Sequence, residues 1–238
     1  MILNILPDLM SGNWREALIY LLFTLVIVVF TLSIHEAAHG FIANKMGDPT
    51  SKSLGRLTIN PIKHLDPIGF LAMLVFGFGW AKPVPINARH FKNPKWGMAL
   101  TGIAGPIANL IMGIVGSILY GFTLPIWARL SAQEGFVGNI ANVMPLFFFL
   151  LGMYNFIFMA FNLIPLPPFD GSRFFYAFLP TKVYFGIMKY ERFILLGLFA
   201  VLFVLTRFFG ISPFSWIAEK IFYGVANPFF LLGKLLFL

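Results

Sequence analysis

The 238-residue chain contains no cysteine and few charged residues. Without cysteine it can form neither a disulfide framework, nor a thiolate metal site, nor a thiol nucleophile. Charged residues make up 11% of the chain, against about a quarter in soluble domains. A separate soluble domain therefore has little sequence left to build it.

Apolar residues dominate instead, at 59% of the chain with a mean hydropathy of +0.85. Long apolar runs recur from one end to the other, which is typical of a polytopic membrane protein. We predict an all-α fold of about five to six transmembrane or re-entrant helices. It forms one domain over residues 1–238, a multi-pass protein of the cell membrane.

The formal net charge of +8 raises the question of nucleic acid. The basic residues lie in short loops between apolar runs, where the positive-inside rule and anionic lipid account for them. We therefore expect the lipid bilayer as a partner and no nucleic acid. The first apolar run has no A-x-A-like cleavage site after it, so we do not interpret it as a removable signal peptide.

The apolar pattern divides the chain into segments. Predicted long helices cover 17–45, 98–123, 145–169, 193–206 and 221–237. Residues 66–81 are apolar but number only about 16, whereas a full span needs about 20, so this segment is expected to be re-entrant or tilted. Residues 124–144 are expected to form a loop. A small interfacial β-hairpin is possible near residues 50–62, where "SLGRLTI" could be extended.

The distribution of positive charge favours the re-entrant interpretation of residues 66–81. If that segment re-enters, the loops 45–65, 82–97 and 171–192 share one side, which the positive-inside rule makes cytoplasmic. These loops hold 12 of the 17 basic residues: Lys45, Lys52, Arg56, Lys63, Lys82, Arg89, Lys92, Lys95, Arg173, Lys182, Lys189 and Arg192. A full crossing would instead translocate the basic loop 82–97.

Residues 35–39, "HEAAH", fit the pattern H-E-x-x-H. His35 and His39 are four apart and lie on one face of a helix, so both imidazoles can bind one Zn²⁺. Glu36 lies beside them and can accept a proton from a bound water. Three ionisable groups at membrane depth are costly, which favours a functional site over a pair of core histidines.

A catalytic zinc needs a third protein ligand and an open position. Asp170 follows "NLIPLPPF" on the same side as HEAAH, and the prolines there interrupt the helix. Irregular backbone at membrane depth is tolerated where it lines a wet cavity. The other carboxylates fit less well: Asp66 as the N-cap of the next helix, Glu191 beside basic residues, Asp48 too near along the chain and Glu134 on the opposite side. His64 and His90 are interpreted as non-ligands.

These segments together resemble the site-2 protease family of intramembrane zinc metalloproteases. HEAAH and "NLIPLPPFDG" (162–171) match its two metal signatures, and "GIAGPIAN" (102–109) resembles the segment between them. "LGRLTINPIKHLDPIG" and "GWAKPVPIN" resemble loops of compact members without a PDZ or CBS domain.

The resemblance implies His35, His39 and Asp170 as ligands of one zinc per chain and Glu36 as the general base. It also implies cleavage within or near a substrate's transmembrane segment, by a catalytic core of about 17–192 followed by C-terminal helices at 193–238. His35 lies 18 residues after Ala17, about 27 Å along a helix. The zinc is therefore expected near the cytoplasmic edge of the membrane.

Two further sets of residues are candidates with alternatives. Asn162 and Asn109 could donate to the oxyanion or position the substrate, or could join helices by hydrogen bonds. Leu54, Gly55, Arg56 and Leu57 could hold an extended substrate by β-augmentation, or belong to an ordinary hairpin. Gly102, Gly105 and Gly113 are expected to permit close helix contacts.

Two other functions remain open at this stage. One is a membrane metalloprotease of another type, acting on prenylated or misfolded proteins. The other is a metal-binding membrane protein without hydrolysis, in which Glu36 would be dispensable. The sequence identifies neither the substrate, nor a regulatory partner, nor the oligomeric state.

Overall fold

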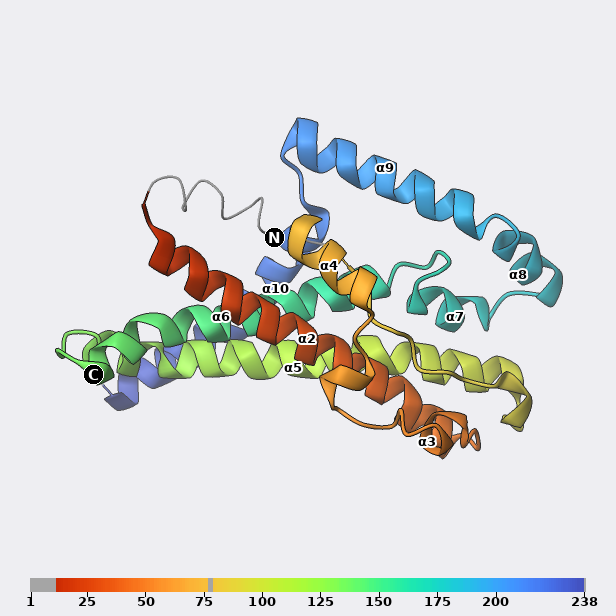
Figure 1. The fold of residues 1–238 in the computed structure, drawn as a ribbon, viewed down its shortest axis with the longest axis horizontal. Helices are drawn as coiled ribbons and strands as arrows, with labels where there is room; N and C mark the ends of the chain where they lie inside the picture. Colours follow the sequence, from red (N-terminus) through yellow and green to blue (C-terminus); the bar gives the residue numbers. More distant parts are fainter. Residues whose placement is uncertain (1–11, 77–78, 238) are drawn as a thin grey trace.

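The computed structural model describes residues 12–76 and 79–237, and Figure 1 shows an assembly of helices. Four helices are long and apolar enough to cross a membrane: α2 (Trp14–Lys45), α5 (Pro94–Leu130), α6 (Phe136–Asn162) and α10 (Pro213–Phe237). The described residues contain no β-strand. The predicted class, an all-α polytopic membrane protein, is confirmed.

Shorter helices connect or flank the long ones. They are α3 (Thr50–Ser53), η1 (Pro61–Lys63), α4 (Pro67–Phe76), η2 (Ala88–His90), α7 (Asp170–Tyr176), α8 (Thr181–Met188) and α9 (Glu191–Phe209). In Figure 1, α3, the start of α5 and α7 lie toward one end of the bundle. The turn between α5 and α6 and the C-terminus lie toward the other. The C-terminal end of α2, which follows HEAAH and leads to α3, therefore lies toward the same end as α7, which begins at Asp170.

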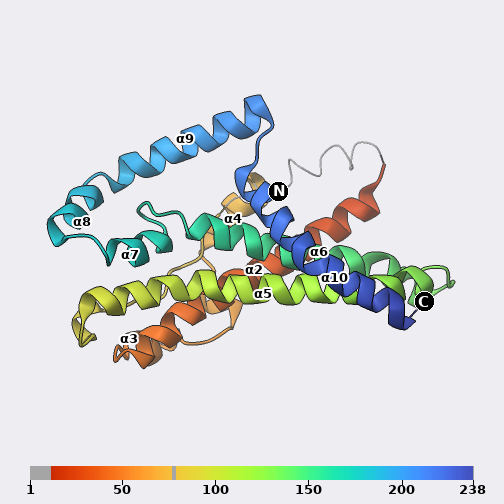
Figure 2. The same cartoon turned by 180° about the vertical axis from the view of Figure 1, so that it is seen from behind.

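Close packing of α5, α6 and α10 depends on glycines. A Cβ on Gly121 would lie 2.1 Å from the carbonyl oxygen of Ala226, and one on Gly116 would lie 2.6 Å from the nitrogen of Gly152. Small residues let helix backbones approach closely in lipid, where van der Waals packing drives association. Phe156 and Phe222 fill the core between α6 and α10, and Figure 2 shows these two helices from behind. The C-terminal helix α10 is thus an integral part of the bundle.

The two ends of the segment that contains α4 lie next to each other. Leu65 and Ala81 form an antiparallel bridge, and the amide of Lys82 donates to the carbonyl of His64 at 2.7 Å. Asp66 caps the helix through the amide of Gly69 at 2.8 Å, as predicted. The ten residues of α4 span about 15 Å, which is shorter than a full crossing, and Leu65 and Ala81 meet at the bridge. Both observations favour the re-entrant interpretation.

The loop predicted at residues 124–144 is wrong. Helix α5 continues to Leu130 and α6 begins at Phe136, so only residues 131–135 connect them. Pro125 and Pro145 lie inside these helices. Proline breaks helices in water, but neighbouring helices and local adjustments compensate for the lost hydrogen bond in a membrane bundle.

The hairpin predicted near residues 50–62 is also wrong. Helix α3 occupies its first residues, and the amide of Leu54 donates to the carbonyl of Thr50. Gly55 then reverses the chain with a φ of +64°, a conformation that favours glycine. Local helical hydrogen bonds therefore replace the extended arrangement expected for this stretch.

Helix α9 differs from the other long helices. It runs apart from the bundle in both views, and several of its apolar side chains are exposed, among them Phe193, Leu196 and Phe208. Only residues 192–206 form its apolar stretch, which is shorter than the four candidate spans. The predicted count of five to six membrane helices is accordingly not confirmed.

Candidate metal centre

Helix α2 presents two histidines to one point, as the H-E-x-x-H spacing predicts. His35 and His39 are both buried, and their Nε2 atoms lie 3.0 Å apart. Asp170 meets them at the start of α7, with Oδ2 at 3.0 Å from Nε2 of His35 and 3.2 Å from Nε2 of His39. Three potential ligand atoms, from positions about 130 residues apart, thus form one compact triangle.

Two glycines allow Asp170 to reach this position. Residues 163–169 follow α6 as irregular backbone containing three prolines, and α7 then folds back. A Cβ on Gly171 would lie 2.4 Å from the carbonyl oxygen of Leu163, and one on Gly102 would lie 3.0 Å from the carbonyl oxygen of Asp170. A side chain at either position would push Asp170 away from the histidines.

The triangle fits a zinc ion. Tetrahedral ligands about 2.0–2.1 Å from zinc lie about 3.3 Å apart, close to the separations seen here, and His₂-carboxylate is a known type of catalytic donor set. Gly105 of α5 keeps the adjacent space open, because a Cβ there would lie 2.5 Å from Nε2 of His35 and 2.6 Å from Nε2 of His39. Gly105 therefore clears the metal position itself, beyond the helix contact that the sequence suggested.

Helix α5 also contacts the far side of each imidazole. Nδ1 of His39 donates to the carbonyl of Thr101 at 2.7 Å, which leaves Nε2 with a lone pair for a metal. Pro106 of α5 has no N–H, so it cannot donate to the carbonyl of Gly102 four residues earlier, and it loosens this turn of the helix. Nδ1 of His35 lies 3.1 Å from the side-chain amide of Asn109, which is buried.

Glu36 has a backbone partner of its own. Its Oε2 accepts a hydrogen bond from the amide of Val84 at 2.7 Å. Val84 belongs to the extended segment after the α4 loop, and its side chain is 6% exposed. One oxygen of the predicted base is thus held by the protein backbone.

The structure does not bring every candidate to the metal centre. The amide of Asn162 donates to the carbonyl of Phe158 in its own helix. Leu54 is exposed, and Gly55 and Leu57 lie in the turn after α3. Arg56 donates from Nη2 to the carbonyls of Lys82 and Pro83, at 2.8 and 3.3 Å.

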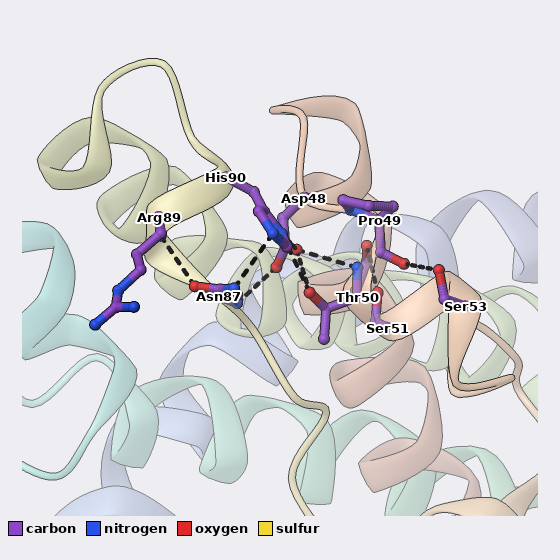
Figure 3. A network of polar contacts seen from close by, with 9 residues as sticks. Asp48, Pro49, Thr50, Ser51, Ser53, Asn87, Arg89 and His90 are labelled. Atoms are coloured by element: carbon purple, nitrogen blue, oxygen red, sulfur yellow. Dashed lines mark hydrogen bonds and ion pairs between the residues drawn. The ribbon is translucent and has the colours of Figure 1, made fainter.

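The remaining histidines belong to other networks. Nε2 of His64 contacts the carbonyl of Thr58 at 2.7 Å. His90 contacts Asp48, which is fully buried and also accepts from the amides of Thr50 and Asn87. Figure 3 shows this network, in which the backbone amide of Arg89 donates to Asn87 while the Arg89 side chain points away. Within the described residues, the group that could hold a metal is His35, His39 and Asp170, so His64 and His90 lie outside it as expected.

Asp48 is a carboxylate saturated with donors. Burial alone would raise its pKa, but hydrogen bonds from Thr50, His90 and Asn87 outweigh that effect and lower the pKa to about 2. Asp48 is therefore an anion that ties the end of α2 to the loop 87–90. No oxygen of it is left for a metal.

The profile of Peptidase family M50 matches residues 23–205, which include both histidines, Glu36 and Asp170. The chain belongs to this family, the site-2 protease family. It is a membrane metalloprotease. The resemblance inferred from HEAAH and NLIPLPPFDG is thus confirmed.

Three curated relatives agree with this assignment. "Putative zinc metalloprotease YwhC" of Bacillus subtilis is 40% identical over 185 residues, covering 78% of this chain and 80% of the relative. "Putative zinc metalloprotease Rip2" of Mycolicibacterium smegmatis is 30% identical, over 63% of this chain and 55% of the relative. "Zinc metalloprotease MJ0392" of Methanocaldococcus jannaschii is 31% identical, over 69% and 36%. No solved structure matches the chain.

Three contacts of the M50 site were not anticipated from sequence. They are the Thr101 carbonyl on His39, the Val84 amide on Glu36 and the Arg56 side chain on the segment that carries Val84. The first two use backbone groups, which every residue possesses, so no residue type marks them. Arg56 was already a candidate, but the strand interpretation assigned it another role.

Proposed function

We propose that this protein hydrolyses peptide bonds within or near transmembrane segments of membrane proteins, with one zinc held by His35, His39 and Asp170. The observation that carries the proposal is the convergence of three ligand atoms within 3.2 Å beside Glu36, on a helix long and apolar enough to span a membrane. When bound, zinc polarises the scissile carbonyl and makes an attacking water more acidic.

Glu36 acts as the general base. It takes a proton from the attacking water as the water oxygen bonds to the carbonyl carbon, and it transfers this proton to the leaving nitrogen as the C–N bond breaks. Since Oε2 is held by the amide of Val84, Oε1 is the oxygen that faces the reacting water. A carboxylate held on one side loses less orientational freedom when the reaction begins.

Asn109 serves the metal ligand and not the oxyanion. Its side chain lies at Nδ1 of His35, on the opposite edge of the ring from the ligand atom Nε2, and its Oδ1 is buried without a partner. A 180° turn of the amide directs Oδ1 at an Nδ1–H donor and satisfies both groups. His35 then presents its Nε2 lone pair to zinc.

The active site faces the cytoplasm in this proposal. The basic loops 45–65 and 82–97 lie toward the same end of the bundle as α7, and the positive-inside rule assigns that end to the cytoplasm. The proposal places the protein in the cell membrane, and the four candidate spans support a location in a membrane. The substrate is a transmembrane protein or peptide, and a regulatory partner would control its access.

The decisive experiment compares the wild type with Glu36→Gln. Membranes from cells that express either form are analysed by N-terminal labelling and mass spectrometry for new protein ends. New ends within transmembrane segments should appear with the wild type alone, while both proteins retain zinc. Equal sets of new ends, with zinc bound in both, would exclude the proteolytic mechanism.

A further inference from the structure

The extended segment after the α4 loop, residues 81–87, runs past the predicted base. We call it the strap. Prolines stand at 83 and 85, so these two positions have no N–H and a fixed φ. The amides of Lys82, Val84 and Asn87 donate to His64, Glu36 and Asp48, each at 2.7 Å. These three donors are thus engaged by the protein, and two prolines provide none, which leaves a poor edge for pairing with a substrate strand.

Arg56 anchors the strap from the carbonyl side. Its Nη2 donates to the carbonyls of Lys82 and Pro83, the two residues immediately before Val84. Its Nε is buried, so part of the guanidinium is packed inside the protein. Hydrogen bonds from a charged donor are about twice as strong as neutral ones. Arg56 therefore limits the movement of the strap directly beside the residue that contacts Glu36.

The Val84 side chain and the Asp48 network anchor the strap further along. Val84 is buried, and a Cβ on Gly40 would lie 3.3 Å from its Cγ1, so Gly40 of α2 makes room for it. Asn87 is bound to Asp48, as Figure 3 shows. Because the strap is attached on both sides of Val84, we expect it to stay fixed and not to open as a lid for each substrate.

We propose that Arg56 is a positioning residue for catalysis, acting on Glu36 through the strap. Arg56 fixes the carbonyls of Lys82 and Pro83, these fix the amide of Val84, and that amide orients the carboxylate of Glu36. The catalytic part of this inference rests on the proposed proteolytic function. The anchoring part is a physical property of the protein and can be measured without a substrate.

Hydrogen exchange measures the anchoring. Because proline has no amide hydrogen, a fragment spanning residues 83–85 reports the amide of Val84 alone. In purified full-length protein, Arg56→Ala should accelerate exchange of this amide about 10-fold, the value expected for a lost hydrogen bond from a charged group. Arg89→Ala, an exposed arginine of the neighbouring loop, is the matched control and should leave the rate unchanged. Equal rates in both variants would overturn the anchoring.

Kinetics measure the catalytic consequence. With a fluorogenic peptide built on a cleavage site found by N-terminal labelling, Arg56→Ala should lower kcat about 10-fold, leave KM within about twofold and retain zinc. Arg56→Lys should restore part of kcat. An unchanged kcat despite faster exchange at Val84 would overturn the positioning role. If the wild type yields no cleavage site while the exchange result holds, proteolysis fails and the anchoring stands.

A second variant tests the same contact without touching Arg56. Val84→Pro removes the N–H that Glu36 accepts, whereas Val84→Ala keeps the N–H and removes only side-chain atoms. We expect a larger fall in kcat for Val84→Pro than for Val84→Ala, with zinc retained in both. Equal losses would assign the effect to packing and overturn the role of the amide.

Discussion

Two clusters in this protein combine histidine with an aspartate, which is fully buried at Asp48 and partly buried at Asp170, and they are built in opposite ways. Around Asp48, the amides of Thr50 and Asn87 and the ring of His90 direct donors at the carboxylate. Around Asp170, the Nε2 atoms of His35 and His39 approach the carboxylate, while Nδ1 of His39 donates elsewhere.

The difference separates a structural anion from a metal site. A carboxylate whose oxygens accept several hydrogen bonds is stabilised as an anion by its neighbours, and its lone pairs are already occupied. When both histidines carry their proton on Nδ1, the two Nε2 atoms and the Asp170 oxygen are three acceptors that face one another, and a cation between them would hold them together. Composition alone does not distinguish the two, since each contains an aspartate and at least one histidine.

Removing the two aspartates should separate the clusters most sharply. Asp170→Ala is expected to lower zinc affinity more than about 100-fold, since even residues that only hydrogen-bond to a metal ligand are worth about 10–100-fold. Asp48→Ala should retain one zinc per chain. Metal analysis of the two purified proteins makes the comparison. If Asp170→Ala retains zinc, the third ligand must be another residue.

A methyl group at Gly105 should act on the metal cluster alone. The added Cβ would lie 2.5 Å from Nε2 of His35, so one ring must rotate away from its ligand position. We expect zinc affinity to fall about 10–100-fold, the range found for disturbed ligand orientation. Gly224→Ala is the control, since nothing lies within 4 Å of its Cβ position. Competition with a zinc chelator measures both variants.

The Asp48 cluster should show itself in the pH dependence of stability. Its pKa is lowered from 3.8 to about 2, so the carboxylate stabilises the fold above the unfolded pKa. That contribution, on the order of 2 kcal/mol, is lost as the pH falls from about 5 toward 2. Asp48→Asn should unfold more easily than the wild type at pH 7, and the gap should narrow on acidification.

Thermal unfolding of both proteins in the same detergent gives this gap at each pH. Arg89→Ala is the control, because arginine does not titrate in this range. A gap that stays constant down to pH 3 would mean that Asp48 acts by packing and not as an anion.

The grouping of His35, His39 and Asp170 was largely predictable because it follows short rules. His35 and His39 meet because a helix repeats every 3.6 residues, and the interrupted helix before Asp170 has three prolines to mark it. The four long helices were also visible as apolar runs, although their ends were not. Pro125 and the polar residues after it resembled a loop, whereas in the structure Pro125 is buried inside α5.

What the sequence did not provide was the support around these ligands. The Val84 amide and the Thr101 carbonyl are backbone groups without a distinguishing residue type. The strand expected over residues 53–59 is absent because Gly55 and local helical hydrogen bonds determine the backbone conformation there. Arg56 then points from this turn to the carbonyls of the strap, a contact that depends on tertiary structure alone.

The bridge between Leu65 and Ala81 closes the α4 segment at its base. Everything between these two residues is a side branch of the chain, so its length is decoupled from the path of the rest. A change in the length of this segment would leave the strap beginning on the same side of the bilayer. An epitope or a fluorophore could be added to this segment, because the path of the chain outside Leu65 and Ala81 does not depend on its length.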